Sequence, residues 1–224
     1  MLIKGGTTPS FFKSNAALLQ KQIDISEEDI DQLDQFDEYG CSHETLAILN
    51  KFPIHLTPGE NDMIRSWMVD GTHDGNWEVF LSIFDNIPPL PEGITVYRGV
   101  ILYGSSTIES FTYINTAIST TICKMIAENF ADRGKKGLIL EIHVPAGEKV
   151  LPLLPSFQYN DAEEFVSPEY EVVLPRGTLI PIDFYVDDDP YPTLEMKFTT
   201  KSTRIHVDDE LNDDLHEYVN KTRY

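Results

Sequence analysis

Two carboxylates at alternate positions are the sharpest chemical signal in the sequence. Glu169 and Glu171 open the segment 169–178, which reads Glu-Tyr-Glu-Val-Val-Leu-Pro-Arg-Gly-Thr. Side chains alternate along an extended strand, so we expect the two carboxylates on one face and Val172 and Leu174 on the other. Like charges side by side repel each other, and a face that keeps them is expected to meet a cationic ligand. An exposed acidic face is the structural alternative.

An arginine beside a glycine precedes this pair, in the sequence Tyr97-Arg98-Gly99. The planar guanidinium of an arginine can bind a phosphate through two parallel hydrogen bonds. A glycine has no side chain, so a ligand can approach its backbone closely. These residues suit a phosphate-bearing ligand, and the alternative is a plain turn at the end of a strand.

Hydroxyl side chains and a short basic stretch lie between the arginine and the carboxylates. Ser119-Thr120-Thr121 leads into a predicted helix, where hydroxyls can brace a neighbouring strand, orient a carboxylate or cap the helix. Beyond that helix, Phe130 is followed by Arg133, Lys135 and Lys136. This is the only concentrated basic stretch beside an aromatic residue, so we expect an anion such as a dinucleotide pyrophosphate there. A solvated surface loop is the alternative.

The chain is strongly acidic, with 17 basic against 37 acidic side chains and a formal net charge of −20 among 224 residues. Nucleic acids are bound by basic surfaces, so this charge argues against nucleic acid as the main partner. A field of this sign favours encounters with basic protein surfaces. Hydrophobic residues make up 41% of the chain, which is enough to build a core.

The remaining composition argues against several kinds of site. Cys41 and Cys123 are too few for a disulfide framework or a zinc site, and we expect them to be ordinary small side chains. The six histidines lack the HExxH spacing of a metal site, so no metal is expected. No apolar run approaches the roughly 20 residues of a membrane span, and residues 1–6 lack a secretory signal pattern. We therefore expect no membrane association and action in a cytoplasm, that of a host cell included.

The first half of the chain carries helical patterns. Ser42 can cap a short helix that contains Leu46 and Leu49. Residues 57–60, Thr-Pro-Gly-Glu, have the form of a capping box with proline at the first helical position. Apolar residues at helical spacing continue to Phe84, and the proline-rich residues 88–91 end the pattern. These observations predict a helical lobe over about residues 15–90.

From residue 94 the pattern changes to strands. We predict strands over residues 95–97, ending at residues 98–99, and over 138–144, 169–174, 179–186 and 194–207. One helix is predicted over residues 121–131, and Leu211, Leu215 and Val219 predict a short closing helix in an acidic tail, residues 208–224. Helices first and strands later predict a single α+β domain with its β-rich core over about residues 94–207. The lack of βαβ alternation and of a GxGxxG motif excludes a Rossmann unit.

The three chemical features occur in a distinctive order: Arg98, then Ser119-Thr120-Thr121, then Glu169-Tyr170-Glu171. This order resembles the arginine-specific mono-ADP-ribosyltransferases, whose R-S-E signature is an arginine, then Ser-Thr-Ser, then Glu-x-Glu. The family includes binary actin-modifying toxins and the host-modifying transferases of T4-type phages. The resemblance covers about residues 94–185 and implies the family's fold, a helical lobe packed on a mixed, mainly antiparallel β core. Thr121 departs from the usual serine but keeps the hydroxyl.

The resemblance also implies a role for each matching residue. Arg98 and Arg133 would hold the pyrophosphate of NAD, and Phe130 would pack against its nicotinamide ring. Glu171 would stabilise the positive charge that develops on the ribose as nicotinamide leaves. Ser119 would help to position Glu171.

A second group of residues would complete the NAD site and receive the target. Glu169 would orient or deprotonate the incoming arginine side chain of the target protein. Gly99 would contribute backbone contacts near the nicotinamide amide. The other residues implied are Tyr97 and Thr120 at the nucleotide, and Phe157, Tyr159 and Phe165 in a substrate-recognising loop over residues 156–168.

On this interpretation NAD is consumed as a substrate and no cofactor is required. The chain would be a monomeric glycosyltransferase that moves ADP-ribose from NAD to an arginine of a basic target protein, as a phage or bacterial effector. Two alternatives stay open: an NAD glycohydrolase, in which water replaces the protein acceptor, and a non-catalytic relative that only binds a target. The presence of Arg98, Ser119, Glu169 and Glu171 argues against the second alternative.

Overall fold

A computed structural model describes residues 40–49, 81–103, 106–132, 136–153, 170–186, 190–205 and 207–221. Most of the predicted helical lobe, with the capping box at residues 57–60, lies outside the described residues. The described helices are α4 (His43–Leu49), the 3-10 helices η1 (Ile83–Asn86) and η2 (Ile108–Phe111), α7 (Lys124–Ala131) and α8 (Asp209–Lys221). The described strands are β1 (Ile94–Ile101), β2 (Tyr113–Ile114), β3 (Ile118–Thr121), β4 (Gly137–Val144), β5 (Leu151–Leu153), β6 (Glu171–Leu174), β7 (Gly177–Tyr185) and β8 (Thr193–Thr199).

The eight strands form one sheet in the order β2-β7-β8-β4-β1-β3-β6-β5. Neighbouring strands are antiparallel except β4 and β8, which are parallel. Among the described elements, the helices do not alternate with the strands in the manner of βαβ units. The predicted α+β class with a mixed, mainly antiparallel core is therefore confirmed.

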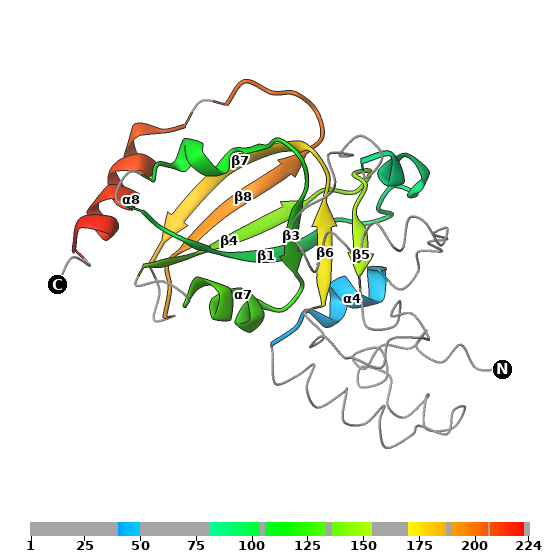
Figure 1. Ribbon diagram of the computed structural model, residues 1–224, viewed down its shortest axis with the longest axis horizontal. Coiled ribbons are helices and arrows are strands. Elements are labelled where there is room, and N and C mark those ends of the chain that lie inside the picture. Colours follow the sequence, from blue (N-terminus) through cyan, green and yellow to red (C-terminus); the bar gives the residue numbers. More distant parts are fainter. Residues whose placement is uncertain are drawn as a thin grey trace, which may run out of the picture.

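The sheet changes direction between β1 and β3. β1 pairs with β4 along its whole length, whereas it pairs with β3 only where Tyr97 faces Thr121. In Figure 1, β3, β6 and β5 accordingly run across the direction of β1, β4, β8 and β7. The end of β3 therefore reaches both the middle of β1 and the start of β6, which is where the sequence places its chemical features.

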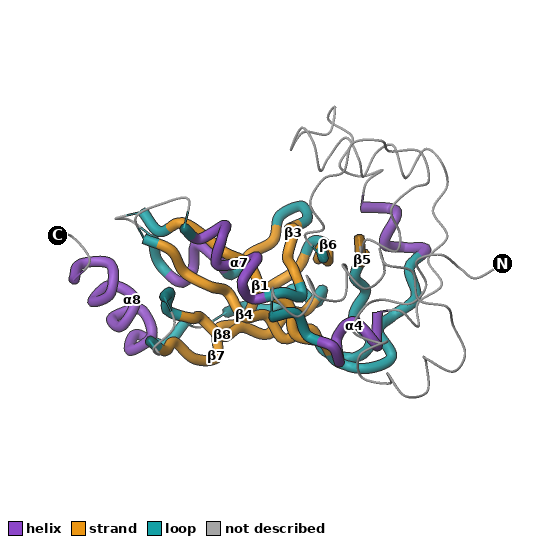
Figure 2. Tube along the Cα trace, turned by 90° about the horizontal axis from the view of Figure 1, so that it is seen from below, coloured by secondary structure: helices purple, strands orange, loops and turns teal. Residues whose placement is uncertain are grey.

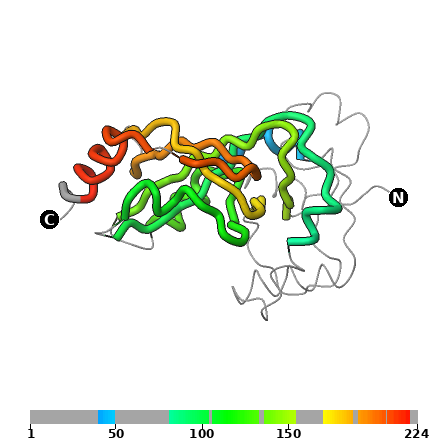
Figure 3. The backbone as a smooth tube through the Cα atoms, turned by 90° about the horizontal axis from the view of Figure 1, so that it is seen from above, coloured from blue at the N-terminus to red at the C-terminus, as the bar shows by residue number. Residues whose placement is uncertain are grey.

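Helices lie at both ends of the sheet and over its middle. α8 lies at one end of the sheet and α4 lies towards the opposite end in two perpendicular views (Figures 1 and 3), and α7 lies beside β1 (Figure 2). α4 begins as predicted, because the Ser42 side-chain oxygen accepts a hydrogen bond from the backbone N–H of Thr45 at 3.2 Å. Leu46 and Leu49 are fully buried on the inner face of α4. The predicted capped helix is thus confirmed.

The acidic C-terminal segment is a docked helix. Leu215 and Val219 of α8 are buried in the core. The side chain of Asn212 accepts a hydrogen bond from the backbone N–H of Ile108 at 3.1 Å, and Lys136 donates one to the carbonyl oxygen of Val219. The predicted closing helix is confirmed, and it is packed on the sheet rather than a free acidic tail. No described helix, α8 included, is long and apolar enough to cross a membrane.

Several predicted bounds are wrong, each for a local reason. β1 continues to Ile101 instead of ending at residues 98–99, because β4 pairs with it along that whole length. α7 begins at Lys124 instead of residue 121, since Thr121 is still paired in the sheet. β8 ends at Thr199, well before residue 207, where the chain leaves its pairing with β7.

Candidate active site

Three adjacent strands bring the predicted residues together. β3 lies between β1 and β6, and Thr121 at its end is directly opposite both Tyr97 and Glu171. Arg98 on β1, Ser119 on β3 and Glu171 on β6 therefore follow one another across the sheet in the same order as in the sequence. The site is built where the sheet changes direction.

The guanidinium of Arg98 is fixed to β3. Its Nη1 donates a hydrogen bond to the backbone carbonyl oxygen of Ser119 at 2.5 Å. Burial lowers the pKa of Arg98 from its ordinary value, and the negative charge of Glu171 opposes that lowering. An arginine nevertheless stays protonated in proteins, so Arg98 is a fixed positive charge beside a carboxylate. This contact uses one of the five N–H donors of the guanidinium.

Glu171 is a buried carboxylate. It is 4% exposed and is the first residue of β6. Glutamates are rarely buried without compensation, because taking a charge out of water costs several kcal/mol. The positive charge of Arg98 supplies compensation from a nearby strand. The structural alternative, a solvent-exposed acidic face, is therefore wrong for Glu171.

The backbone turns immediately before Glu171. Tyr170 has a φ of 44°, and it is the one non-glycine residue with a positive φ in the described part of the chain. The left-handed region costs a residue with a β-carbon about 1–2 kcal/mol. β6 starts at Glu171, after Tyr170, so the predicted strand does not begin at residue 169, and the same-face arrangement of the two carboxylates stays a prediction. Glu169 itself lies outside the described residues.

The threonines of the Ser-Thr-Thr triplet hold the local backbone. Thr120 is buried, and its hydroxyl donates a hydrogen bond to the carbonyl oxygen of Val172 on β6 at 2.5 Å. The hydroxyl of Thr121 accepts a hydrogen bond from the backbone N–H of Cys123 at 3.1 Å, where the chain turns into α7. The prediction that these hydroxyls brace a neighbouring strand is confirmed for Thr120. That hydroxyl is therefore engaged with β6, which does not favour its predicted place at NAD.

Gly99 is required because the backbone of α7 lies very close to it. A β-carbon at this position would lie 1.9 Å from the carbonyl oxygen of Ala127 and 2.6 Å from the backbone nitrogen of Ala131. The backbone of α7 therefore packs directly on β1, which only a glycine permits. Sequence reasoning explained the glycine by the approach of a ligand, whereas here it accommodates α7.

Tyr97 lies on the other side of β1 from Arg98. Its ring packs beneath α7, against Ala127, Ala131 and Ile139. Successive residues of a strand face opposite sides of the sheet, so Tyr97 and Arg98 leave β1 on opposite sides, and Tyr97 shares its side with its partner Thr121, which also pairs with Glu171. The structure does not bring Tyr97 to the side of β1 on which the arginine lies.

The other predicted residues divide into one that is described and several that are not. Phe130, near the end of α7, is partly buried and packs against the main hydrophobic core. Arg133, which follows this helix, lies outside the described residues. The same holds for the predicted substrate-loop residues Phe157, Tyr159 and Phe165.

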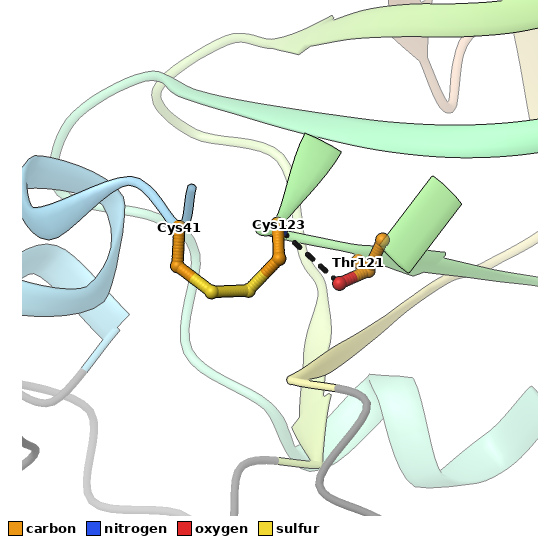
Figure 4. The surroundings of a disulfide bond; sticks show 3 residues. All are labelled: Cys41, Thr121 and Cys123. Atoms are coloured by element: carbon orange, nitrogen blue, oxygen red, sulfur yellow. Dashed lines mark hydrogen bonds between the residues drawn. A yellow bond between two sulfur atoms is a disulfide. The ribbon is translucent and has the colours of Figure 1, made fainter. Parts of the chain in front are cut away.

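A disulfide bond joins Cys41 to Cys123 (Figure 4). The two residues are 82 apart in sequence, pair directly across an isolated antiparallel bridge, and are both buried. Cys41 lies just before α4, and Cys123 is the residue before α7. The expectation that both cysteines are ordinary small side chains is therefore wrong. Two isolated cysteines carry no pairing signal until the fold that juxtaposes them is known.

A second polar cluster, which the sequence did not reveal, lies on β1, β4, β7 and β8. His143 contacts Thr95 Oγ1 through Nδ1 at 3.0 Å and Glu195 through Nε2 at 2.8 Å. The Tyr185 hydroxyl donates to Glu141 at 3.3 Å, and burial together with that carboxylate raises the pKa of Tyr185 to about 12. These side chains therefore find hydrogen-bond partners within the cluster. Within the described residues, no three His, Cys, Asp or Glu side chains are placed to hold a metal ion.

No protein-family model and no curated protein matches the sequence. Among solved structures, the Vis toxin, an ADP-ribosyltransferase from Vibrio splendidus, is 15% identical over 80% of this chain and 88% of its own, with a TM-score of 0.45. An ADP-ribosyltransferase toxin from Paenibacillus larvae is 13% identical over 74% and 96%, with a TM-score of 0.46. An ADP-ribosyltransferase from Clostridium botulinum is 14% identical over 74% and 94%, with a TM-score of 0.45. Similarities this weak do not assign an activity, which has to come from the side chains of the site.

Proposed function

We propose that this chain is a mono-ADP-ribosyltransferase, which cleaves NAD between nicotinamide and ribose and transfers ADP-ribose to an arginine of a target protein. One observation carries the proposal: Arg98, Ser119 and Glu171 lie on the adjacent strands β1, β3 and β6, with the buried carboxylate near the arginine. These three residues match the R-S-E signature in both type and order. A fixed cation beside a fixed anion suits a substrate with a pyrophosphate and a ribose that becomes positively charged.

Arg98 binds the pyrophosphate in this scheme. Its hydrogen bond to the carbonyl oxygen of Ser119 orients the guanidinium plane before the substrate arrives. A preorganised planar fork loses little side-chain entropy on binding and can meet two phosphate oxygens at once. Arg133 supplies a second contact to the pyrophosphate, and Phe130 packs against the nicotinamide ring.

Glu171 acts on the ribose. As the bond from C1′ to nicotinamide breaks, its electron pair leaves with nicotinamide and positive charge develops on the ribose. The buried carboxylate at the start of β6 stabilises that charge, and Ser119 helps to position it. A preorganised charge in surroundings of low dielectric constant is most effective where charge develops during the reaction. The acceptor then forms its bond to C1′.

The acceptor is an arginine side chain. A guanidinium is a poor nucleophile because its pKa exceeds about 12, so a carboxylate that orients it and takes its proton is needed. Glu169 has this role, and the segment with Phe157, Tyr159 and Phe165 recognises the target surface. A net charge of −20 favours a basic target. Glu169→Gln is expected to lose transfer to arginine while retaining slow NAD hydrolysis, and equal loss of both activities would contradict this role.

The setting that fits this scheme is the cytoplasm of a host cell, where NAD is consumed as a substrate by a monomeric effector. Purified protein is incubated with labelled NAD, with and without an arginine-rich acceptor protein, and both free nicotinamide and labelled acceptor are measured. Release accompanied by label on arginine supports the proposal. Release without any labelled protein means that water is the acceptor and the chain is an NAD glycohydrolase. No release by a folded protein overturns the proposal and leaves a target-binding relative.

A further inference from the structure

Five residues form a small clasp behind Glu171, which we call the Tyr170 clasp: Cys41, Ser42, Ile122, Cys123 and Tyr170. The disulfide joins Cys41 to Cys123 (Figure 4). The backbone N–H of Ser42 donates to the carbonyl oxygen of Ile122 at 3.1 Å, and the N–H of Ile122 donates to the carbonyl oxygen of Tyr170 at 3.2 Å. These bonds join three segments in one row: the chain before α4, the end of β3 and the start of β6.

The clasp holds Tyr170 inside the protein. Ile122 and Cys123 are fully buried, Cys41 is nearly so, and Tyr170 is among the largest of the fully buried side chains. The ring packs in the main core together with both cysteines. The side chain and the carbonyl of Tyr170 are therefore both fixed by their surroundings.

The backbone of Tyr170 needs such surroundings. Its φ of 44° lies in a region that a residue with a β-carbon occupies only where neighbouring groups over-determine it. If Tyr170 relaxed to an extended conformation, the chain direction before Glu171 would change. The first residue of β6, the proposed catalytic carboxylate, would then move relative to Arg98.

A second route connects the clasp to the carboxylate. Thr121 precedes Ile122 on the chain, pairs directly with Glu171, and accepts a hydrogen bond from the backbone N–H of Cys123. Figure 4 shows this hydrogen bond beside the disulfide. Breaking the disulfide is therefore expected to affect Glu171 in two ways: through Tyr170, its neighbour in the chain, and through Thr121, its partner across the sheet.

We propose that Tyr170 is a positioning residue for Glu171, held in its left-handed conformation by the clasp, so that reducing the Cys41–Cys123 disulfide slows NAD cleavage. The inference rests on the proposed function. In the covalent step a dithiol reductant supplies two electrons and two protons, the sulfur–sulfur bond breaks into two thiols, and the reductant becomes a disulfide. The rate then depends on the redox state of residues that touch neither NAD nor the target, and a reducing cytoplasm would hold the enzyme in its slower form.

The first test compares the redox states. For the wild type and the Cys41→Ser/Cys123→Ser double variant, kcat and KM for NAD cleavage are measured with and without a dithiol, and reduction is checked by counting free thiols. Reduction is expected to lower the wild-type kcat roughly tenfold or more, the scale of a small misplacement of a catalytic group. KM stays close to its starting value, because Arg98 is held by Ser119 and not by the clasp. The double variant has the low kcat in both conditions.

The second test separates the backbone of Tyr170 from its ring. Tyr170→Gly and Tyr170→Ala both remove the ring, but glycine enters the left-handed region freely and alanine does not. The kcat of Tyr170→Ala is expected to be roughly five- to thirtyfold below that of Tyr170→Gly at similar KM. A purely structural role would lower thermal stability without separating the glycine and alanine variants in kcat.

The outcomes distinguish the two proposals. If the oxidised wild type releases no nicotinamide, the proposed function is wrong. If it is active but kcat is the same before and after verified reduction, and equal in the Tyr170→Gly and Tyr170→Ala variants, only the positioning role is overturned.

Discussion

Replacing Gly99 by alanine is expected to push α7 away from β1. The new β-carbon would lie 1.9 Å from the carbonyl oxygen of Ala127 and 2.6 Å from the backbone nitrogen of Ala131. Both atoms belong to the helix backbone, which cannot rotate aside as a flexible side chain could. Because close carbon–oxygen contacts lie near about 3.3 Å, the helix has to move by roughly 1.4 Å at this point.

The energetic effect of this displacement can be bracketed. Overpacking of a core costs about 1–3 kcal/mol, and the upper end applies where backbone must move. A chain of this size loses roughly 2–4 °C in Tm for each kcal/mol, so Tm is expected to fall by roughly 6–12 °C. Because α7 carries Phe130 and leads to Arg133, NAD affinity is expected to fall as well.

Thermal unfolding followed by circular dichroism and NAD binding followed by calorimetry measure both effects. Gly147→Ala is a matched control, since its φ is 89° and, apart from its chain neighbours, no atom of the described residues lies within 4 Å of the added β-carbon. It carries only the left-handed strain of about 1–2 kcal/mol and is expected to leave NAD affinity unchanged. A wild-type Tm for Gly99→Ala would refute the packing argument. Weaker NAD binding at unchanged Tm would mean that Gly99 serves the ligand directly.

Three further changes test other parts of the structure. Thr120→Val removes the buried hydrogen bond to Val172 and is expected to cost about 1–3 kcal/mol in urea unfolding, so an unchanged midpoint would contradict it. Glu141→Gln should lower the pKa of Tyr185 from about 12 towards 10.0, measured by tyrosinate absorbance. Since folding raises that pKa, the stability that protonated Tyr185 contributes is present below about pH 10 and is lost as the pH rises through about 12. If the pKa of Tyr185 does not respond to Glu141→Gln, the carboxylate is not a cause of the shift. Arg98→Lys keeps the charge but loses the planar fork, so NAD affinity by calorimetry should fall roughly tenfold, and unchanged affinity would remove Arg98 from the site.

The elements that the sequence predicted well are those whose signals are local. The Ser42 cap with Leu46 and Leu49 satisfies a helix over two turns without help from distant residues. The closing helix likewise shows its buried positions, Leu215 and Val219, at helical spacing. Such patterns are set by neighbours in sequence and survive in the folded structure.

The features that the sequence missed depend on contacts between distant segments. The pairing of Cys41 with Cys123 follows from the fold that brings the start of α4 to the end of β3. The left-handed Tyr170 is an aromatic residue in a conformation that its own propensity disfavours, so tertiary contacts impose it. The reason for Gly99 likewise appears only when α7 is placed on β1.

Some residues of the candidate site lie where the sequence predicted and others do not, and strand geometry explains part of the difference. Arg98, Ser119 and Glu171, which the sequence singled out by type and order, lie on adjacent strands. Tyr97 stays a prediction, because it faces the opposite side of β1 from Arg98 but pairs with Thr121, which also pairs with Glu171. Thr120 required the structure, since its engagement with β6 depends on which strand lies beside it.

The most direct test of the proposed activity compares Glu171→Gln with Glu141→Gln in nicotinamide release from NAD. Both changes replace a carboxylate by an amide of the same shape, but only Glu171 is buried near Arg98 at the junction of β1, β3 and β6. Losing one preorganised charge at a transition state is expected to lower the rate by about 10²–10³, whereas Glu141→Gln keeps the wild-type rate. Thermal unfolding verifies that both variants are folded. Near-wild-type turnover by a folded Glu171→Gln protein would contradict the assignment of Glu171 as the catalytic carboxylate.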